Sequence, residues 1–137
     1  MLLILDANEY IFGLGISKKL TCEALLEKIA EIFPHHNIRI PRLIVREVQN
    51  NLSPEEFKKF VSLINTFTTI DEDISVPFDL VYRFELMGLK PADSFIAAYT
   101  QWVGAEILVS ENRHFLLRQD NLPFRVINAE RCLKLFH

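Results

Sequence analysis

Three acidic residues in the sequence are placed where they can do metal-assisted chemistry. Asp6 ends a short apolar run, Glu47 lies in an amphipathic stretch after a second run, and Asp93 stands two residues after a proline. Carboxylates that gather at one edge of a sheet repel one another unless a cation neutralises them, and Mg²⁺ and Mn²⁺ prefer oxygen ligands. A metal held in this way lowers the pKa of bound water and stabilises a leaving oxygen. The pattern therefore predicts a Mg²⁺ or Mn²⁺ site suited to phosphodiester hydrolysis.

Each of these acids also has a purely structural explanation, which the sequence leaves open. Asp6 can cap the turn after its strand, and Asp93 can cap the helix SFIAAYTQWV or interact with its dipole. Glu47 can be an exposed residue on the outer face of a helix. For Asp93 the structural and the functional explanation are compatible.

Basic residues lie close in the sequence to the acidic positions and are candidates for substrate binding. Cationic groups at the rim of the metal site can hold the phosphates of a substrate. The candidates are Arg42, Arg46, Lys90 and Arg113, together with the imidazole of His114. Their alternative is an ordinary solvated face.

The order of strands and helices predicts how these residues come together. Apolar runs predict strands at residues 2–5, 38–40, 106–109 and 124–127. Caps and helical periodicity predict helices from Thr21 to Pro34, after Pro41, from the cap Ser53 through Ile64, over 78–87, over 93–103, around 114–118 and after the cap Asn128. Because parallel neighbours need helical crossovers, this alternation predicts a three-layer α/β/α fold with a central, mostly parallel sheet. Such sheets bind ligands at the carboxyl ends of their strands, where Asp6 and residues 110–112 are expected.

The composition predicts one domain that spans residues 1–137. Of the 137 residues 50% are hydrophobic and eleven are Phe, which provides one substantial core, and we assign Trp102 to packing as well. The net charge of -3 and the pI near 5.8 argue against a protein that neutralises many phosphates of a long nucleic acid. Nucleic acid as a transient substrate stays open.

Cysteine usage and the lack of a long apolar segment predict a cytoplasmic location. Cys22 and Cys132 have no second Cys or His at ligand spacing, so we expect reduced thiols in or near the core. The apolar start of the chain is interrupted by Asp6, and no window approaches the roughly 18 apolar residues of a spanning helix. We therefore expect neither a signal peptide nor a membrane anchor.

Four segments together resemble the PIN-domain ribonuclease family, in particular its VapC-like toxin branch. The resemblance spans nearly the whole chain and is carried, in this order, by LLILDANEYI, IPRLIVREVQNNL, KPADSFIAAYTQWVGAEILVSENRHF and PFRVINAERCL. It implies a PIN-like fold and a nuclease that cuts RNA with Mg²⁺ or Mn²⁺ held by three or four acidic residues. It also implies a homodimer and an antitoxin partner that covers the active-site groove.

The resemblance also assigns roles to individual residues. The three acids above match metal-binding positions of the family, and Asn8 and Ser110 match polar positions that support the metal site. Asn112 matches the catalytic position at which many relatives carry a fourth acid. An amide keeps an oxygen but removes a negative charge, so a second metal is in doubt. Glu111 can compensate only if its side chain turns the same way, and adjacent residues rarely do.

The leading hypothesis is a metal-dependent endoribonuclease that acts as the toxin of a type II toxin–antitoxin pair. Asn112 favours an alternative, a non-catalytic RNA- or protein-binding module that has lost one acid. A third hypothesis starts from Asp6-Ala7-Asn8, which resembles the aspartate-nucleophile motif of haloacid-dehalogenase-like phosphatases. The second aspartate of that motif is missing, so this hypothesis ranks last.

Overall fold

Five short parallel strands form one sheet in the order β3-β2-β1-β4-β5. The computed structural model describes residues 1–32 and 36–136. The strands are β1 (Leu2–Leu5), β2 (Asn37–Pro41), β3 (Thr69–Asp71), β4 (Ile107–Val109) and β5 (Arg125–Ile127). The sheet is flanked by helices, as the alternating pattern predicts. The edge strand β3 has no counterpart among the predicted strands, because its three residues are too few to give an alternating pattern.

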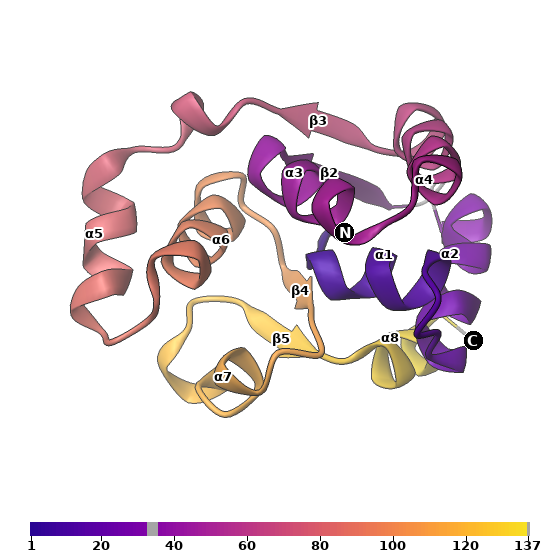
Figure 1. Cartoon of the computed structure of the whole chain (residues 1–137). Coiled ribbons are helices and arrows are strands. Elements are labelled where there is room, and N and C mark those ends of the chain that lie inside the picture. The colour runs from indigo at the N-terminus through magenta and orange to yellow at the C-terminus, as the bar shows by residue number, and fades with distance from the viewer. Residues whose placement is uncertain (33–35, 137) are drawn as a thin grey trace.

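Eight α-helices and two short 3₁₀ turns connect the strands in the described part of the chain. The helices are α1 (Ala7–Leu14), α2 (Leu20–Ile32), α3 (Arg42–Asn51), α4 (Pro54–Phe67), α5 (Phe78–Leu86), α6 (Pro91–Trp102), α7 (Arg113–Leu116) and α8 (Ala129–Leu135). The 3₁₀ turns are η1 (Asp73–Ser75) and η2 (Gln119–Asn121). In Figure 1 the strands run between α5 and α6 on the left and α1, α2 and α8 on the right. Within these groups α1 packs on α2, α2 on α8, and α5 on α6.

Two helix starts differ from the sequence-based prediction. The helix α2 begins at Leu20, so Thr21 lies inside it and does not cap it. The helix α6 begins at Pro91, which places Asp93 in its first turn and not at the cap position, which Lys90 occupies. Proline at the first helical position starts the helix earlier than the apolar periodicity indicates, since it needs no hydrogen bond there.

The core lies on both faces of the central strands. Leu3, Ile4 and Leu5 of β1 and all of β4 are buried, as expected for central strands of a parallel sheet. Cys22 and Cys132 are free and buried, as predicted. Trp102 is not a core residue: 41% of its surface is exposed, because it is the last residue of α6. None of the helices in the described ranges is long and apolar enough to cross a membrane.

The N-terminus of α4 is fixed by a capping box that the sequence predicts. The hydroxyl of Ser53 accepts a hydrogen bond from the Glu56 backbone N–H, and the Glu56 carboxylate accepts one from the Ser53 backbone N–H. We expect Ser53→Ala to lower the free energy of unfolding by about 1 kcal/mol, because it leaves a helix N–H without its acceptor. Urea unfolding measures this change, and Ser62→Ala, on an exposed position of the same helix, is the control. Equal losses in both variants would contradict a capping role.

Candidate functional site

Asp6 is held at the carboxyl end of β1 by hydrogen bonds from two directions. Its Oδ1 accepts from the Ala7 N–H at 2.8 Å, which caps α1, and its Oδ2 accepts from the Ser110 hydroxyl at 2.7 Å. Only 7% of the residue is exposed. Burial raises the pKa of this carboxyl and the charge of Asp93 adds to the rise, although both hydrogen bonds oppose it. Asp6 therefore combines the capping role with a constrained carboxylate at the sheet edge.

The segment after β4 connects Asp6 to Asp93. The Ser110 hydroxyl, which donates to Asp6, also accepts from the Asn112 backbone N–H at 3.0 Å. The Asn112 side chain uses its oxygen to cap α7, accepting from the His114 N–H at 2.9 Å, and its amide nitrogen donates to Asp93 Oδ1 at 3.2 Å. Asn112 thus offers Asp93 a donor in place of a fourth negative charge.

Glu47 completes the acidic group from the helix α3. It is half-buried, and its pKa is raised by burial first and then by the charges of Asp6 and Asp93. The three side chains therefore come from three separate elements and influence one another electrostatically. We call them the acidic triad. The ligand atoms of the triad do not all lie within 4.8 Å of one another, so its spacing is open. In the described residues only Glu9, Cys22 and Glu111 meet that distance.

A small hollow of about 120 Å³ lies beside Asp93 and contains two of the predicted substrate-binding residues. Its lining is Gly88, Leu89, Lys90, Asp93, His114 and Arg118. Arg118 was not among the sequence candidates, since it is distant in sequence from every acid of the triad. Its guanidinium donates to the Met87 carbonyl at 2.9 Å, and this hydrogen bond holds the side chain beside the hollow. Three side chains that can hold a phosphate therefore border the Asp93 carboxylate.

The other residues predicted to bind substrate or to support the site do not line this hollow. Arg46 forms an ion pair with Asp73 at 2.6 Å, and Arg42 pairs with Glu72 at 3.0 Å, so both are engaged by the acids around η1. Arg113 is exposed in α7. Asn8 is half-buried in the first turn of α1. Of the basic residues predicted to surround the acids, Lys90 and His114 line the hollow beside Asp93, and their role in substrate binding stays a prediction.

Glu111 does not supply a fourth acid to the triad. Its Oε1 accepts from Lys19 Nζ at 3.2 Å and its Oε2 accepts from the Ala129 N–H at 3.0 Å. The side chain therefore turns toward α2 and α8, while its neighbour Asn112 turns toward Asp93. Adjacent residues in extended backbone point in opposite directions, which is the reason that compensation fails.

A second polar cluster, which the sequence reasoning missed, lies where Glu111 points. Glu9 on α1 is fully buried, and its Oε2 accepts from the Cys22 thiol at 3.2 Å. Burial raises the pKa of Glu9 to about 9 from 4.5, with a hydrogen bond to Glu111 and the Glu111 charge adding to the rise. The signal in the sequence is an acid on the core-facing side of the otherwise apolar helix ANEYIFGL.

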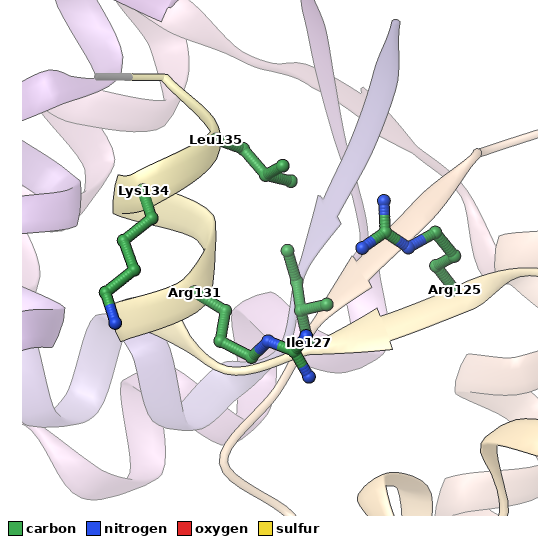
Figure 2. Close-up of a pocket in the computed structure, with 5 residues that line it drawn as sticks. All are labelled: Arg125, Ile127, Arg131, Lys134 and Leu135. Atoms are coloured by element: carbon green, nitrogen blue, oxygen red, sulfur yellow. The ribbon is translucent and has the colours of Figure 1, made fainter.

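A basic hollow was missed as well. Arg125, Ile127, Arg131, Lys134 and Leu135 line it, with a volume of about 330 Å³. Figure 2 shows Arg125 of β5 and Arg131 of α8 on either side of Ile127, whereas Lys134 points away from both. The hollow can hold an anion, but Arg125 is paired with Ile107 at the start of β4, so it lies at the opposite strand end from Ser110.

Comparison with known proteins identifies the fold and corrects the family assignment. No family model and no curated protein sequence matches the chain. A chain of VapBC2 from Rickettsia felis, solved bound to a promoter DNA fragment, superposes with a TM-score of 0.64 and 19% identity over 93% of this chain and 98% of that chain. A chain of FitAcB from Neisseria gonorrhoeae superposes with a TM-score of 0.61 and 15% identity over the same shares.

These likenesses show a PIN-like fold and nothing more specific. The assignment to the PIN-domain ribonuclease family and its VapC-like branch is wrong as a statement of membership, since no family model matches and the identities are too low to carry one. The four segments that suggest the family reflect this fold: apolar strands that end in polar residues, followed by helices.

The buried Glu9 makes stability depend on pH. Because its folded pKa of about 9 exceeds its ordinary value of 4.5, its stabilising contribution is complete below pH 4.5 and is lost as the pH rises toward 9. Glutamine does not titrate. We therefore expect the free energy of unfolding of Glu9→Gln to rise relative to that of the unchanged protein as the pH increases, by up to about 1.4 kcal/mol per pH unit in this range. Urea unfolding between pH 5 and 9 in EDTA measures it. The control Glu85→Gln, at an exposed site, should show the same pH dependence of stability as the unchanged protein. If the stability of Glu9→Gln changes with pH in parallel with that of the unchanged protein, the raised pKa of Glu9 is refuted.

Proposed function

We propose that this protein is a Mg²⁺- or Mn²⁺-dependent endoribonuclease. The observation that carries the proposal is the acidic triad: burial raises the pKa of Asp6 and of Glu47, the charge of Asp93 adds to the rise at both, and the charge of Asp6 adds to it at Glu47. Buried like charges are tolerated when a cation joins them. A structural role for these acids would not require three of them to meet at the carboxyl ends of the strands, where open parallel sheets bind their ligands.

The donor set fits a hard divalent cation. All three ligands are carboxylates, and their open spacing suits Mg²⁺, which keeps several waters and uses one or two carboxylates directly. Asp6 and Asp93 would hold the ion, with Glu47 in reach of its waters. When bound, such an ion activates water and stabilises the leaving oxygen of a phosphodiester.

The chain's own residues orient the carboxylates and the substrate. The Ala7 N–H and the Ser110 hydroxyl fix Asp6, and the Asn112 amide fixes Asp93. Because Asn112 brings no negative charge, the site suits one cation better than two. Lys90, with His114 and Arg118, borders Asp93 and would hold the phosphate next to the scissile bond.

We further propose that the protein is the toxin of a toxin–antitoxin pair and acts in the cytoplasm. Two solved structures with the same fold, VapBC2 and FitAcB, are toxin–antitoxin complexes. The partner would be an antitoxin protein that covers the acidic triad, and the cellular substrate would be RNA. Free, buried cysteines agree with a reducing compartment.

One observation favours a non-catalytic binding module instead. Asn112 carries no negative charge, and both ends of its amide are engaged within the protein, by α7 and by Asp93, so this residue adds little to the binding of a metal. A phosphatase with Asp6 as nucleophile is less suitable, because Asn8 stands where that motif has its second aspartate. Activity with an RNA substrate separates the nuclease from the binding module.

We expect the purified chain to cleave single-stranded RNA when Mg²⁺ or Mn²⁺ is added and to stop when EDTA is added. Asp6→Asn and Asp93→Asn should each lower the rate by a factor on the order of a hundred or more, because each removes a charge that holds the metal. A fluorescence-quenched RNA oligonucleotide measures the rate. Asp120→Asn, on an exposed turn, is the matched control and should leave the rate unchanged.

The fold of each variant is checked by thermal unfolding before rates are compared. Equal cleavage by the unchanged protein and both site variants would show a contaminating nuclease and end the proposal. Binding of RNA without cleavage, by folded protein with metal present, would favour the binding module.

We also propose that a second copy of the chain covers an apolar stripe that runs from η1 along α5. Ile74, Phe78, Tyr82 and Leu86 recur at four-residue steps and are each at least 50% exposed, and the Phe78 and Tyr82 rings stack. Two copies related by a two-fold axis near Leu80 would set Phe78 against the second copy's Tyr82. The exposed charges of Asp79 and Arg83 beside the stripe have opposite signs, so the pair is also self-complementary electrostatically.

Phe78→Ser should convert the dimer to a monomer, because it removes the largest apolar side chain from the centre of the stripe. Light scattering coupled to size-exclusion chromatography measures the mass at micromolar concentration. Leu117→Ser, at an equally exposed apolar position outside the stripe, should leave the dimer intact. A monomeric unchanged protein, or a dimeric Phe78→Ser variant, would contradict this interface.

A further inference from the structure

The second polar cluster has the arrangement of a metal site of a different kind from the acidic triad. One ligand atom each of Glu9, Cys22 and Glu111 lies within 4.8 Å of the other two, which no other group in the described residues achieves. The three residues come from α1, from α2 and from the segment after β4. Glu9 and Cys22 are fully buried, so this is no chance meeting of surface acids.

We propose that Glu9, Cys22 and Glu111 bind one Zn²⁺ ion that acts structurally. A thiolate with two carboxylates is a donor set for zinc, since Mg²⁺ and Mn²⁺ favour oxygen alone. Zinc ligands at their usual bond lengths stand roughly 3.5 Å apart at the corners of a tetrahedron. The Cys22 Sγ and Glu9 Oε2 atoms are 3.2 Å apart, so a small adjustment creates this geometry.

The buried Oε1 atom of Glu9 also points to a ligand. It has no N–H or hydroxyl partner in the part of the chain that the structure describes, and its neighbour Glu111 is a second carboxyl, which can share a hydrogen bond with it only while one of the two is protonated. A carboxylate oxygen in this position costs free energy unless a proton or a cation compensates it. A proton shared with Glu111 is one solution, and a cation bound by both carboxylates is the other.

The charge of the cluster permits the exchange of protons for the ion. Without metal, the Cys22 thiol and the Glu9 carboxyl hold their protons, and the Glu111 carboxylate is neutralised by Lys19 at 3.2 Å. The incoming Zn²⁺ displaces the thiol proton and the carboxyl proton, which leave to solvent, so the net charge of the buried cluster does not change. The exposed Lys19 side chain covers Glu111 and can swing aside to admit the ion.

The surroundings of Glu111 prepare it for this role. Its second oxygen accepts from the Ala129 N–H at the start of α8, which fixes the carboxylate toward Glu9 and Cys22. Hydrogen bonds of this kind orient metal ligands in known sites. An ion here would join α1, α2 and the segment that carries Ser110 and Asn112, and would therefore stiffen the support of the acidic triad.

The test uses the metal alone with the full chain, after EDTA treatment and dialysis. In the double variant Asp6→Asn, Asp93→Asn, which lacks two acids of the triad, one Zn²⁺ per chain should bind and raise the melting temperature. Co²⁺ in its place should give a thiolate-to-metal charge-transfer band in the near ultraviolet. Cys22→Ser should remove the band and the thermal shift, whereas Cys132→Ser, at the other buried cysteine, should keep both. A folded, unchanged protein without the band, or a band that depends on Cys132, would overturn the proposal.

Two further variants keep the test decisive. If Cys22→Ser does not fold, Glu111→Gln serves instead and should weaken zinc binding by roughly tenfold or more. Unaltered affinity in this variant would refute the site. The double variant Asp6→Asn, Asp93→Asn should retain the Co²⁺ band in full, so the zinc site stands or falls separately from the nuclease.

Discussion

The hydrogen bond from the Ser110 hydroxyl to Asp6 Oδ2 is the interaction on which the arrangement of the site depends. It joins the ends of β1 and β4, whose residues are 104 positions apart in the chain, and it acts on a buried carboxylate. Burial and the charge of Asp93 raise the pKa of Asp6, whereas the hydrogen bonds from Ser110 and the Ala7 N–H favour its charged form. The position of α1, which Asp6 caps, follows from the same contact.

The segment after β4 serves two clusters because successive side chains alternate in direction. Ser110 and Asn112 face the acidic triad, where they hold Asp6 and Asp93, whereas Glu111 faces Glu9 and Cys22. Two groups of acids can therefore lie close together in a small fold without merging into one site of excessive charge. Their donor sets differ, since one is all oxygen and the other contains a thiol, and so they suit different cations.

The PIN-like fold places these groups but does not by itself assign a reaction. Folds of this kind present strand ends as a common edge, and chemistry depends on the side chains found there. In this chain the segment after β4 carries Asn112, whose oxygen caps α7 and whose nitrogen donates to Asp93. An amide at this position brings a hydrogen-bond donor and no negative charge, so it adds no repulsion at Asp93.

The sequence by itself determined the parallel α/β architecture, because apolar runs alternate with amphipathic helices. Local signals, such as the capping box from Ser53 to Glu56, mark where helices begin. It also indicated Asp6 and Asp93, because residues that end strands or begin helices after a proline are visible in one dimension. It did not reveal β3, which is too short for a pattern, and it suggested a family assignment that is wrong, because the apparent motifs belong to the fold. Only the tertiary structure decided that Glu111 turns from the triad toward Glu9 and Cys22, and that Arg46 pairs with Asp73. Side-chain direction and ion pairing depend on contacts between distant segments, which no local pattern specifies.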